Sequence, residues 1–254
     1  MTTPAGSTDF SSYIFQAARE RGYTAGRIQE SAPLSRLSYL QEVEVKNRAV
    51  ELFWKDKVLE GSPEPLVESP KPRNYRSTSK RRLFRRGNRY LLLLDPKAEP
   101  QGCAELSDLE PEKHGEIFLF LSRKLNTPGY KILADALNYV ILRESEGRRA
   151  VIFNINRLSS QEVRKIKLLS EHLVSENLSV FSVFYYFDPT QSSYYLESSR
   201  PEDSLNFRRI YGPPKLMLKL AEHRFFYSPT AFSQVNPFIL PEMVNRMGEM
   251  ICSP

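Results

Sequence analysis

The stretch S-P-T-A-F-S-Q-V-N-P at residues 228–237 carries the most informative side-chain pattern in this chain of 254 residues. An aromatic residue, a glutamine and an asparagine occupy the alternating positions Phe232, Gln234 and Asn236. In an extended segment, alternation with period two places all three side chains on one face. A ring and two amides on one face suit a planar, polar, uncharged ligand, such as a nucleobase or an adenine-containing cofactor.

A purely structural interpretation of the same stretch is also open. Asn236 has the side chain of a good helix N-cap, and Pro237 suits the first position of the helix that the following apolar residues indicate. The stretch would then be a buried strand that leads into a capped helix, with no ligand.

The wording S-P-x-x-F-x-Q-V-N, followed by a helical pattern with Met243-Val244, resembles the junction motif of SAM-dependent RNA (uracil-5-)methyltransferases. In that family the motif joins a central RNA-binding domain to a Rossmann-like methyltransferase domain. The resemblance implies that Gln234 contacts S-adenosyl-L-methionine through its amide. It also implies that Phe232 lies near a flipped target base, where stacking replaces the base's lost neighbours. Asn236 matches as well, as a helix cap.

Composition sets broad limits on the class of protein. Apolar residues make up 41% of the chain and charged residues 26%, which is ordinary for a soluble globular protein. The net charge of +6 favours a polyanionic partner without proving one. Two distant cysteines, Cys103 and Cys252, exclude a disulfide framework and a cysteine-rich metal or iron–sulfur site. No run of 18 apolar residues and no signal-peptide core occur, so we expect a cytoplasmic protein without a membrane partner.

The strongest charge feature is the segment 71–90, which contains nine cations and no acidic residue. The runs 80–83 and 89–94 flank a turn signal at Gly87, which predicts a β-hairpin. Such a ribbon could bind RNA phosphates and bases, or it could be a solvated edge strand that uses charge against aggregation. We favour RNA, because a protective edge seldom needs nine like charges. The candidate contacts are Tyr75, Arg76, Lys80, Arg81, Arg82, Arg85, Arg86 and the distant Phe232.

Two shorter words add to the resemblance. Ser69-Pro70 and Tyr75-Arg76 are similar to the S-P-x-x-x-Y-R-N-K stretch that opens the family's central domain. Ser77-Thr78 stands where the family has Asn-Lys, so individual contacts at this point do not carry over.

Periodicity predicts an α+β fold with a mixed or antiparallel sheet and packed helices, preceded by an N-terminal helical segment. Expected helices cover 10–22, 37–59, 111–125 and 159–174, the last with a Ser159/Glu162 capping box; expected strands cover 139–143, 150–155 and 178–187. Four prolines in 61–74 indicate a linker. We therefore expect a helical segment and linker (1–70), a central RNA-binding domain (71–227), and a junction motif with only the first helix of a methyltransferase domain (228–254).

The sequence contains no self-sufficient catalytic constellation and no metal-ligand spacing. His114, His172 and His223 are scattered, and we interpret them as structural or surface residues. The pair Glu144 and Glu146 is interpreted as solvated hairpin charge.

The family's S-C-N-P nucleophile word and glycine-rich SAM motif are both missing from these residues. The chain is therefore expected to be the RNA-binding portion of a uracil-5-methyltransferase-like protein acting on tRNA or rRNA, truncated or split from a separate catalytic chain. The alternatives are a non-catalytic RNA-binding protein of the same descent and a basic interaction protein whose partner is not RNA.

Overall fold

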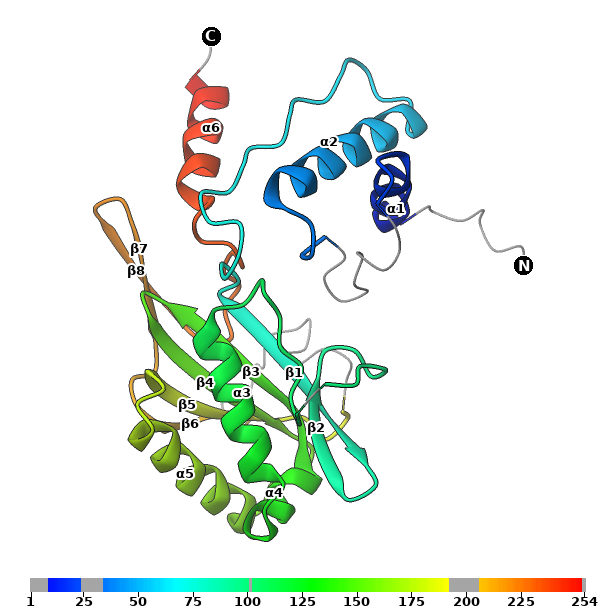
Figure 1. Ribbon diagram of the computed structural model, residues 1–254. Helices are drawn as coiled ribbons and strands as arrows, with labels where there is room; N and C mark the ends of the chain where they lie inside the picture. Colours follow the sequence, from blue (N-terminus) through cyan, green and yellow to red (C-terminus); the bar gives the residue numbers. More distant parts are fainter. Residues whose placement is uncertain (1–8, 24–33, 101, 192–205, 253–254) are drawn as a thin grey trace, which may run out of the picture. The chain divides into compact units, whose positions relative to one another are not determined.

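The computed structural model describes residues 9–23, 34–100, 102–191 and 206–252 (Figure 1). The chain divides into two compact units, Met1–Pro72 and Arg73–Pro254. Residues 228–254, predicted as a separate third segment, fall in the second unit.

The described part of the first unit contains two helices, α1 (Phe10–Glu20) and α2 (Tyr39–Asp56), where the sequence predicts them. Helix α2 begins with a capping box, in which the Ser38 hydroxyl accepts the Gln41 N–H and the Gln41 side chain accepts the Ser38 N–H. The helices pack through small and aromatic side chains, namely Tyr13, Ala17, Ala18, Val45 and Ala49. This confirms the N-terminal helical segment.

The second unit is built on a six-stranded sheet in the order β2-β1-β3-β4-β5-β6 (Figure 1). The strands are β1 (Thr78–Arg86), β2 (Arg89–Leu93), β3 (Leu137–Ser145), β4 (Arg148–Ile155), β5 (Val180–Phe187) and β6 (Phe207–Tyr211). All neighbours are antiparallel except β4 and β5, which are parallel. Helix α5 (Ser160–Ser175) connects this parallel pair, as parallel neighbours require. The sheet is mixed and the fold is α+β, which confirms the prediction.

Helices cover one face of this sheet. They are α3 (Glu112–Leu125), the short 3₁₀ turn η2 (Pro128–Tyr130), α4 (Lys131–Ala136) and α5. Alternate residues of the strands point at them and form the largest apolar core, which includes Leu92, Val140, Leu142, Val151, Phe153, Ile117, Phe118, Leu121, Ile166 and Leu169. The helix-side face therefore supplies most of the burial that holds the unit together.

The opposite face carries a smaller core and leads to a separate two-stranded ribbon, β7 (Leu216–Leu220) and β8 (His223–Tyr227). The chain reaches the ribbon through Gly212, which has φ +72°. A Cβ there would lie 1.9 Å from the Phe181 carbonyl oxygen, so this position requires glycine.

The junction stretch differs from the sequence expectation. Residues 228–239 form no strand, and helix α6 (Leu240–Cys252) begins at Leu240 and not at Pro237. The reason is local: the Asn236 Oδ1 accepts the Phe238 N–H at 3.1 Å, which closes a turn before the helix. Asn236 is thus a turn residue and not the helix cap that we expected.

Candidate nucleic-acid interface

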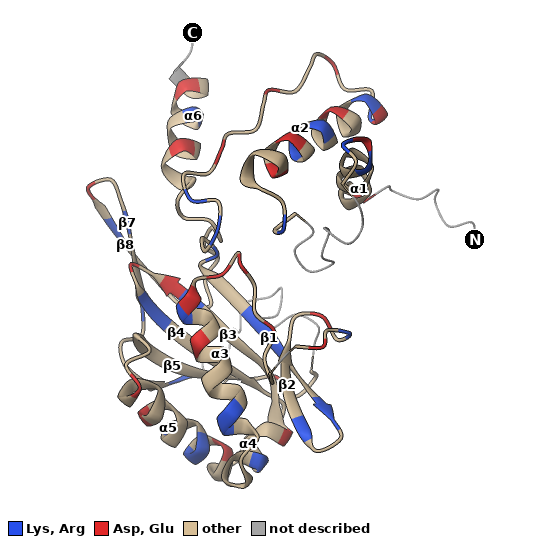
Figure 2. Ribbon diagram, in the orientation of Figure 1, with Lys and Arg blue, Asp and Glu red and all other residues tan. Residues whose placement is uncertain are grey.

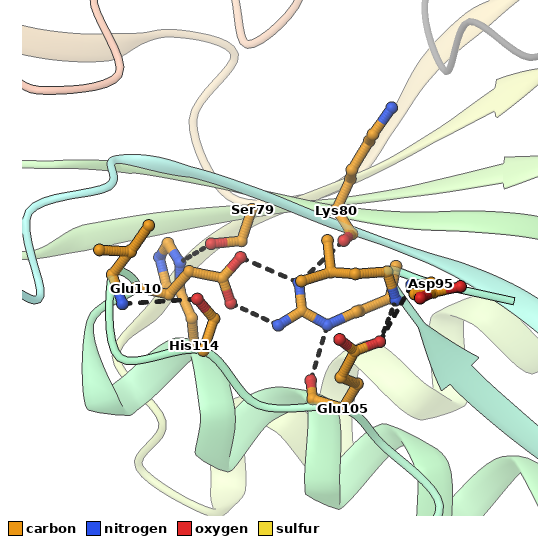
Figure 3. Close-up of polar contacts among 10 residues, drawn as sticks. Ser79, Lys80, Asp95, Glu105, Glu110 and His114 are labelled. Carbon is orange, nitrogen blue, oxygen red and sulfur yellow. Dashed lines mark hydrogen bonds and ion pairs between the residues drawn. The ribbon is translucent and has the colours of Figure 1, made fainter. Parts of the chain in front are cut away.

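Strand β1 sorts its side chains between two different environments. Ser79 and Arg81 are buried on the helix side, whereas Lys80 and Arg82 are exposed. Figure 3 shows the Lys80 side chain pointing away from Glu105, Glu110 and His114. Because successive side chains of a strand point to opposite faces, three adjacent cations cannot all face solvent here.

Arg81 is fully buried, with 0% of its surface exposed. Its guanidinium donates to the Glu105 carbonyl oxygen (2.7 Å) and, through both Nη atoms, to the Glu110 carboxylate (2.9 and 2.5 Å) (Figure 3). It also lies 4.5 Å from the centre of the Phe118 ring on α3. This correction removes Arg81 from the predicted RNA contacts: it is a structural cation that ties the loop before α3 to the sheet.

A second buried polar group lies beside it. The Ser79 hydroxyl is 2.7 Å from His114 Nδ1, and His114 Nε2 is 3.3 Å from Glu144 Oε2, which also lies 2.7 Å from Arg149 Nη2. The contacts of Glu144 Oε2 with His114 and Arg149 are close enough for ion pairs, but neither has the geometry of a hydrogen bond. Ser79 and His114 are sealed from solvent, so this serine–histidine–glutamate arrangement has no route to a substrate and is structural.

Glu144 is therefore not the solvated hairpin charge that the sequence suggested. Burial alone would raise the pKa of Glu144, but the contact with His114 and the positive charge of Arg149 more than offset this and hold that pKa below its usual value.

The exposed side of β1 combines cations with rings. Lys80 Nζ lies 5.8 Å from the centre of the Tyr139 ring on β3, and the Arg82 guanidinium lies 5.8 Å from the same ring and 5.5 Å from that of Phe84. A hollow of about 270 Å³ opens here and is lined by Lys80, Arg82, Phe84, Leu93, Leu94, Pro96 and Tyr139. Desolvation and the nearby charge of Arg76 lower the pKa of Lys80. Like charges crowded together in this way are an arrangement that a polyanion would relieve, and the buried Tyr139 ring holds the two cations in place from below.

The remaining predicted cations lie around this row. Arg85 and Arg86 are exposed at the tip of the hairpin, where Arg86 donates to the Pro96 carbonyl oxygen and Arg85 to that of Gly87 (3.2 Å). Tyr75 and Arg76 are half-buried just before β1, and the Arg76 N–H donates to the Leu109 carbonyl oxygen at 2.9 Å. Lys80 and Arg82 are thus brought together on one face, while Arg85 and Arg86 extend the positive charge beyond it.

The junction loop is fastened to the start of the same strand. The Ser77 N–H donates to the Val235 carbonyl oxygen (2.7 Å) and the Ser77 hydroxyl to that of Gln234 (3.0 Å). The buried Arg143 on β3 donates to the Ala231 carbonyl oxygen (2.9 Å) and to the Ser233 hydroxyl (2.6 Å).

This anchoring presents one ring to solvent. Phe232, between the two groups that Arg143 holds, is 82% exposed, and Gln234 is partly exposed. Arg143 pairs with Thr78 in the sheet. It is separated from Tyr139 by an even number of positions along β3, so both side chains point to the same face. Phe232 therefore stands at the beginning of the row that continues through Lys80, Arg82 and Phe84.

Sequence reasoning missed Tyr139 and Arg143. Tyr139 opens a strand that was predicted, but its place beside Arg82 follows from the pairing of β1 with β3. Arg143 had a local signal, since it is a cation at the end of an apolar strand run.

The described residues offer other features that bear on chemistry. They contain no cluster of three or more histidine, cysteine or acidic side chains that could hold a metal ion. A hollow of about 530 Å³ at the start of α3 is lined by Arg73 and by four acidic residues, Asp108, Glu110, Glu112 and Glu116. Glu110 is paired with Arg81 and Glu116 with Lys113, but the lining is still mainly acidic and suits phosphate less well than the row on β1. Among the helices that the structure describes, none has the length and apolar character needed to cross a membrane.

Comparison with known proteins gives a fold and not a family. No family model and no curated protein matches the chain. Among solved structures, it is similar to a Pyrococcus abyssi tRNA (uracil-54, C5)-methyltransferase in complex with S-adenosyl-L-homocysteine, with 16% identity and a TM-score of 0.54. The match covers 88% of this chain and 51% of that one, so this chain spans about half the length of that protein. The likeness shows a shared fold over that span and agrees with the fold that the junction motif implied.

Proposed function

We propose that this chain is the RNA-binding portion of a SAM-dependent RNA (uracil-5-)methyltransferase-like protein whose substrate is tRNA or rRNA. The observation that carries the proposal is the exposed row on β1, where Lys80 and Arg82 stand over the Tyr139 ring. Cations bind the phosphates of RNA without regard to sequence. Tyr139 is itself buried and supports the two cations from below, so the stacking surfaces left for unpaired bases are the partly exposed Phe84 and the exposed Phe232.

Phe232 gives the row an end with a different role. The loop that holds it is tied to Ser77 and Arg143, so the ring is positioned without being covered. A fixed, exposed ring suits stacking against a base that has left its own helix. We propose that the RNA backbone follows β1 and that the uridine to be modified lies at Phe232.

The proposal extends to S-adenosyl-L-methionine through one residue. The Gln234 carbonyl is held by Ser77, while its partly exposed amide is of the right kind to bond a polar cofactor. This fits the contact that the junction motif implies, but one amide is a single contact and not a binding site.

Helix α6 favours the methyltransferase interpretation over an independent RNA-binding module. Its exposed residues include Met243 (41%), Met247 (53%), Met250 (76%) and Ile251 (79%). An apolar surface of this kind usually packs against another protein body. We propose that this body is a methyltransferase domain, in the same protein or in a separate chain.

RNA binding is tested by salt titration. In the double variant Lys80→Gln/Arg82→Gln, the slope of log affinity against log salt for a tRNA transcript should fall in magnitude by about 1.4 to 1.8, the effect of losing two phosphate contacts. The matched control is Arg164→Gln/Lys167→Gln, which removes two exposed cations from α5 on the other side of the sheet. An equal fall of the salt slope in both variants would contradict a specific RNA-binding surface on β1. If the native chain bound no RNA, the remaining hypothesis would be a basic interaction protein whose partner is not RNA.

The methyltransferase part needs its own assay, with labelled S-adenosyl-L-methionine and uridine-containing RNA. We expect the chain alone to bind RNA without transferring a methyl group, and transfer to require an added methyltransferase domain. Transfer by this chain alone would overturn the proposal that it is only the RNA-binding portion. Retained RNA binding without transfer in any combination would favour the non-catalytic RNA-binding protein.

A further inference from the structure

The β7–β8 ribbon exposes two large aromatic side chains that the row on β1 does not use. Phe225 is 50% exposed and Phe226 is 63% exposed. The base of the ribbon is fixed, because Leu216 is buried and the Ser145 hydroxyl donates to the Met217 carbonyl oxygen at 2.5 Å. Figure 1 shows the ribbon projecting from the end of the sheet where β3 turns into β4.

Strand pairing places the two rings on opposite faces of the ribbon. Phe226 pairs with Met217, and Arg224 pairs with Lys219 two positions away along each strand. Because side chains two positions apart on a strand point to the same face, these four residues share one face of the ribbon. We call Met217, Lys219, Arg224 and Phe226 the Phe226 face. The other face carries Phe225 with Leu218, Leu220 and His223.

Lys219 and Arg224 form an unfavourable pair. They lie directly opposite each other across the two strands and both are exposed. Like charges in this position destabilise a strand pair. Neither side chain forms an ion pair with any residue that the structure describes. Figure 2 shows this positive charge on the ribbon.

Two acidic residues are close enough in sequence or structure to matter. The Glu146 carboxylate accepts the backbone N–H of Lys219 at 3.3 Å, and Glu222 lies in the turn between the strands. Among the residues that the structure describes, neither carboxylate forms an ion pair with Lys219 or Arg224. The net charge of the Phe226 face is therefore positive.

We propose that the Phe226 face binds an unpaired segment of RNA, with a base stacked on Phe226 and phosphates held by Lys219 and Arg224. This rests on the proposed function that the chain binds RNA, and it adds a second contact surface separate from β1. A ring flanked by cations is the combination that binds single strands with little sequence preference. An apolar protein partner would be suited better by the Phe225 face, which has no lysine or arginine.

The ribbon is tested with a fluorescently labelled oligouridine and, for comparison, a blunt RNA duplex. We expect Phe226→Ala to weaken oligouridine binding by about tenfold and duplex binding far less, because one base stack is lost. Phe225→Ala is the matched control, since it removes an exposed ring from the other face of the same ribbon. Equal weakening by both variants would overturn the assignment to the Phe226 face.

The charges give a second, independent readout. Lys219→Gln/Arg224→Gln should reduce the magnitude of the salt slope for oligouridine by about 1.4, the value for two phosphate contacts on a single strand. It should not lower the midpoint of thermal unfolding, because it removes a like-charge pair. An unchanged salt slope would overturn the phosphate contacts at the ribbon.

The same titrations separate the two proposals. Loss of affinity in Lys80→Gln/Arg82→Gln with native affinity in Phe226→Ala would overturn the ribbon contact and leave the proposed function standing. Failure of the native chain to bind either RNA would overturn both, and a protein partner captured by the ribbon in that case would identify the Phe226 face as a protein-binding surface.

Discussion

The two sides of strand β1 put neighbouring arginines to different uses. On the helix side, Arg81 is enclosed by the Glu110 carboxylate, the Glu105 carbonyl and the Phe118 ring. On the other side, Arg82 is exposed and stands over Tyr139. One position along the chain thus separates a cation that stabilises the fold from one that is available to a ligand.

The comparison shows why a count of charges overstates an interface. The segment 71–90 has nine cations, but strand alternation turns Arg81 inward, and the exposed Arg86 is directed to the Pro96 carbonyl oxygen of the loop after β2. What remains for RNA is a shorter row, in which Lys80 and Arg82 are close to rings. The position of charge relative to aromatic side chains says more about the interface than its sum.

The largest effect on stability is expected from a substitution that removes the buried ion pair of Arg81. Arg81→Ala should lower the free energy of unfolding by about 3–5 kcal/mol, because it leaves the Glu110 carboxylate buried without its partner. Arg82→Ala should change it by no more than about 0.5 kcal/mol, as is usual for exposed positions. Urea denaturation of the two variants measures both values.

A double variant distinguishes the ion pair from simple packing. Arg81→Met/Glu110→Leu should recover much of the lost stability, because replacing both charges leaves no buried group unpaired. If the double variant were as unstable as Arg81→Ala, the loss would come from packing on Phe118 and not from the uncompensated carboxylate.

Much of the fold could be predicted from local patterns. The hairpins β1–β2 and β3–β4 each have a glycine in the turn, Gly87 and Gly147, with strand-forming residues on both sides, so their existence follows from the sequence. The helix after Ser159 begins with Ser159 as its N-cap, as predicted, but the hydroxyl accepts the Gln161 N–H and contacts the Glu162 carboxylate, so the two reciprocal bonds of the predicted capping box are not formed. Such features depend on neighbours in the chain.

The site was less predictable because it depends on distant partners. Tyr139 meets Arg82 only through the pairing of β1 with β3, which lie some fifty residues apart and have no sequence signal for their register. Burial of Arg81 depends on Glu110 in an irregular loop. The tripeptide Lys80-Arg81-Arg82 does carry one local signal: strand alternation puts the middle residue on the face opposite to its neighbours, so in a strand with one covered face the three cations cannot all be exposed.

A substitution at the exposed Phe232 should affect RNA binding without affecting stability. Phe232→Ala should weaken RNA binding by about 1–3 kcal/mol through the loss of a stacked base, with no change in the free energy of unfolding, because the ring is 82% exposed. Val235→Ala is the control, since it shortens another exposed apolar side chain of the same loop. Fluorescence anisotropy with a uridine-containing stem–loop gives the affinities. Similar losses in both variants would mean that the loop contributes apolar area and not stacking.

The smallest effect concerns acid stability on the buried side. The pKa of Glu144 is lowered in the fold: burial opposes this, but the contact with His114 and the charge of Arg149 outweigh it. A lowered pKa contributes stability that is present above the unfolded value of about 4.3 and is lost as the pH falls through the folded value. Glu144→Gln should therefore flatten the decline of unfolding free energy below about pH 5.

The pH dependence of the unfolding free energy should differ between variants on the buried and the exposed side of the sheet. Urea denaturation at several pH values should show native protein and Glu144→Gln converging as the pH falls, because protonation removes the same charge that the substitution removes. Lys80→Gln, on the exposed side, should leave the acid limb unchanged, since a lysine keeps its charge throughout this range. An equally steep decline in Glu144→Gln and the native chain would show that His114 and Arg149 do not stabilise the carboxylate, and that the buried group beside Arg81 is held by packing alone.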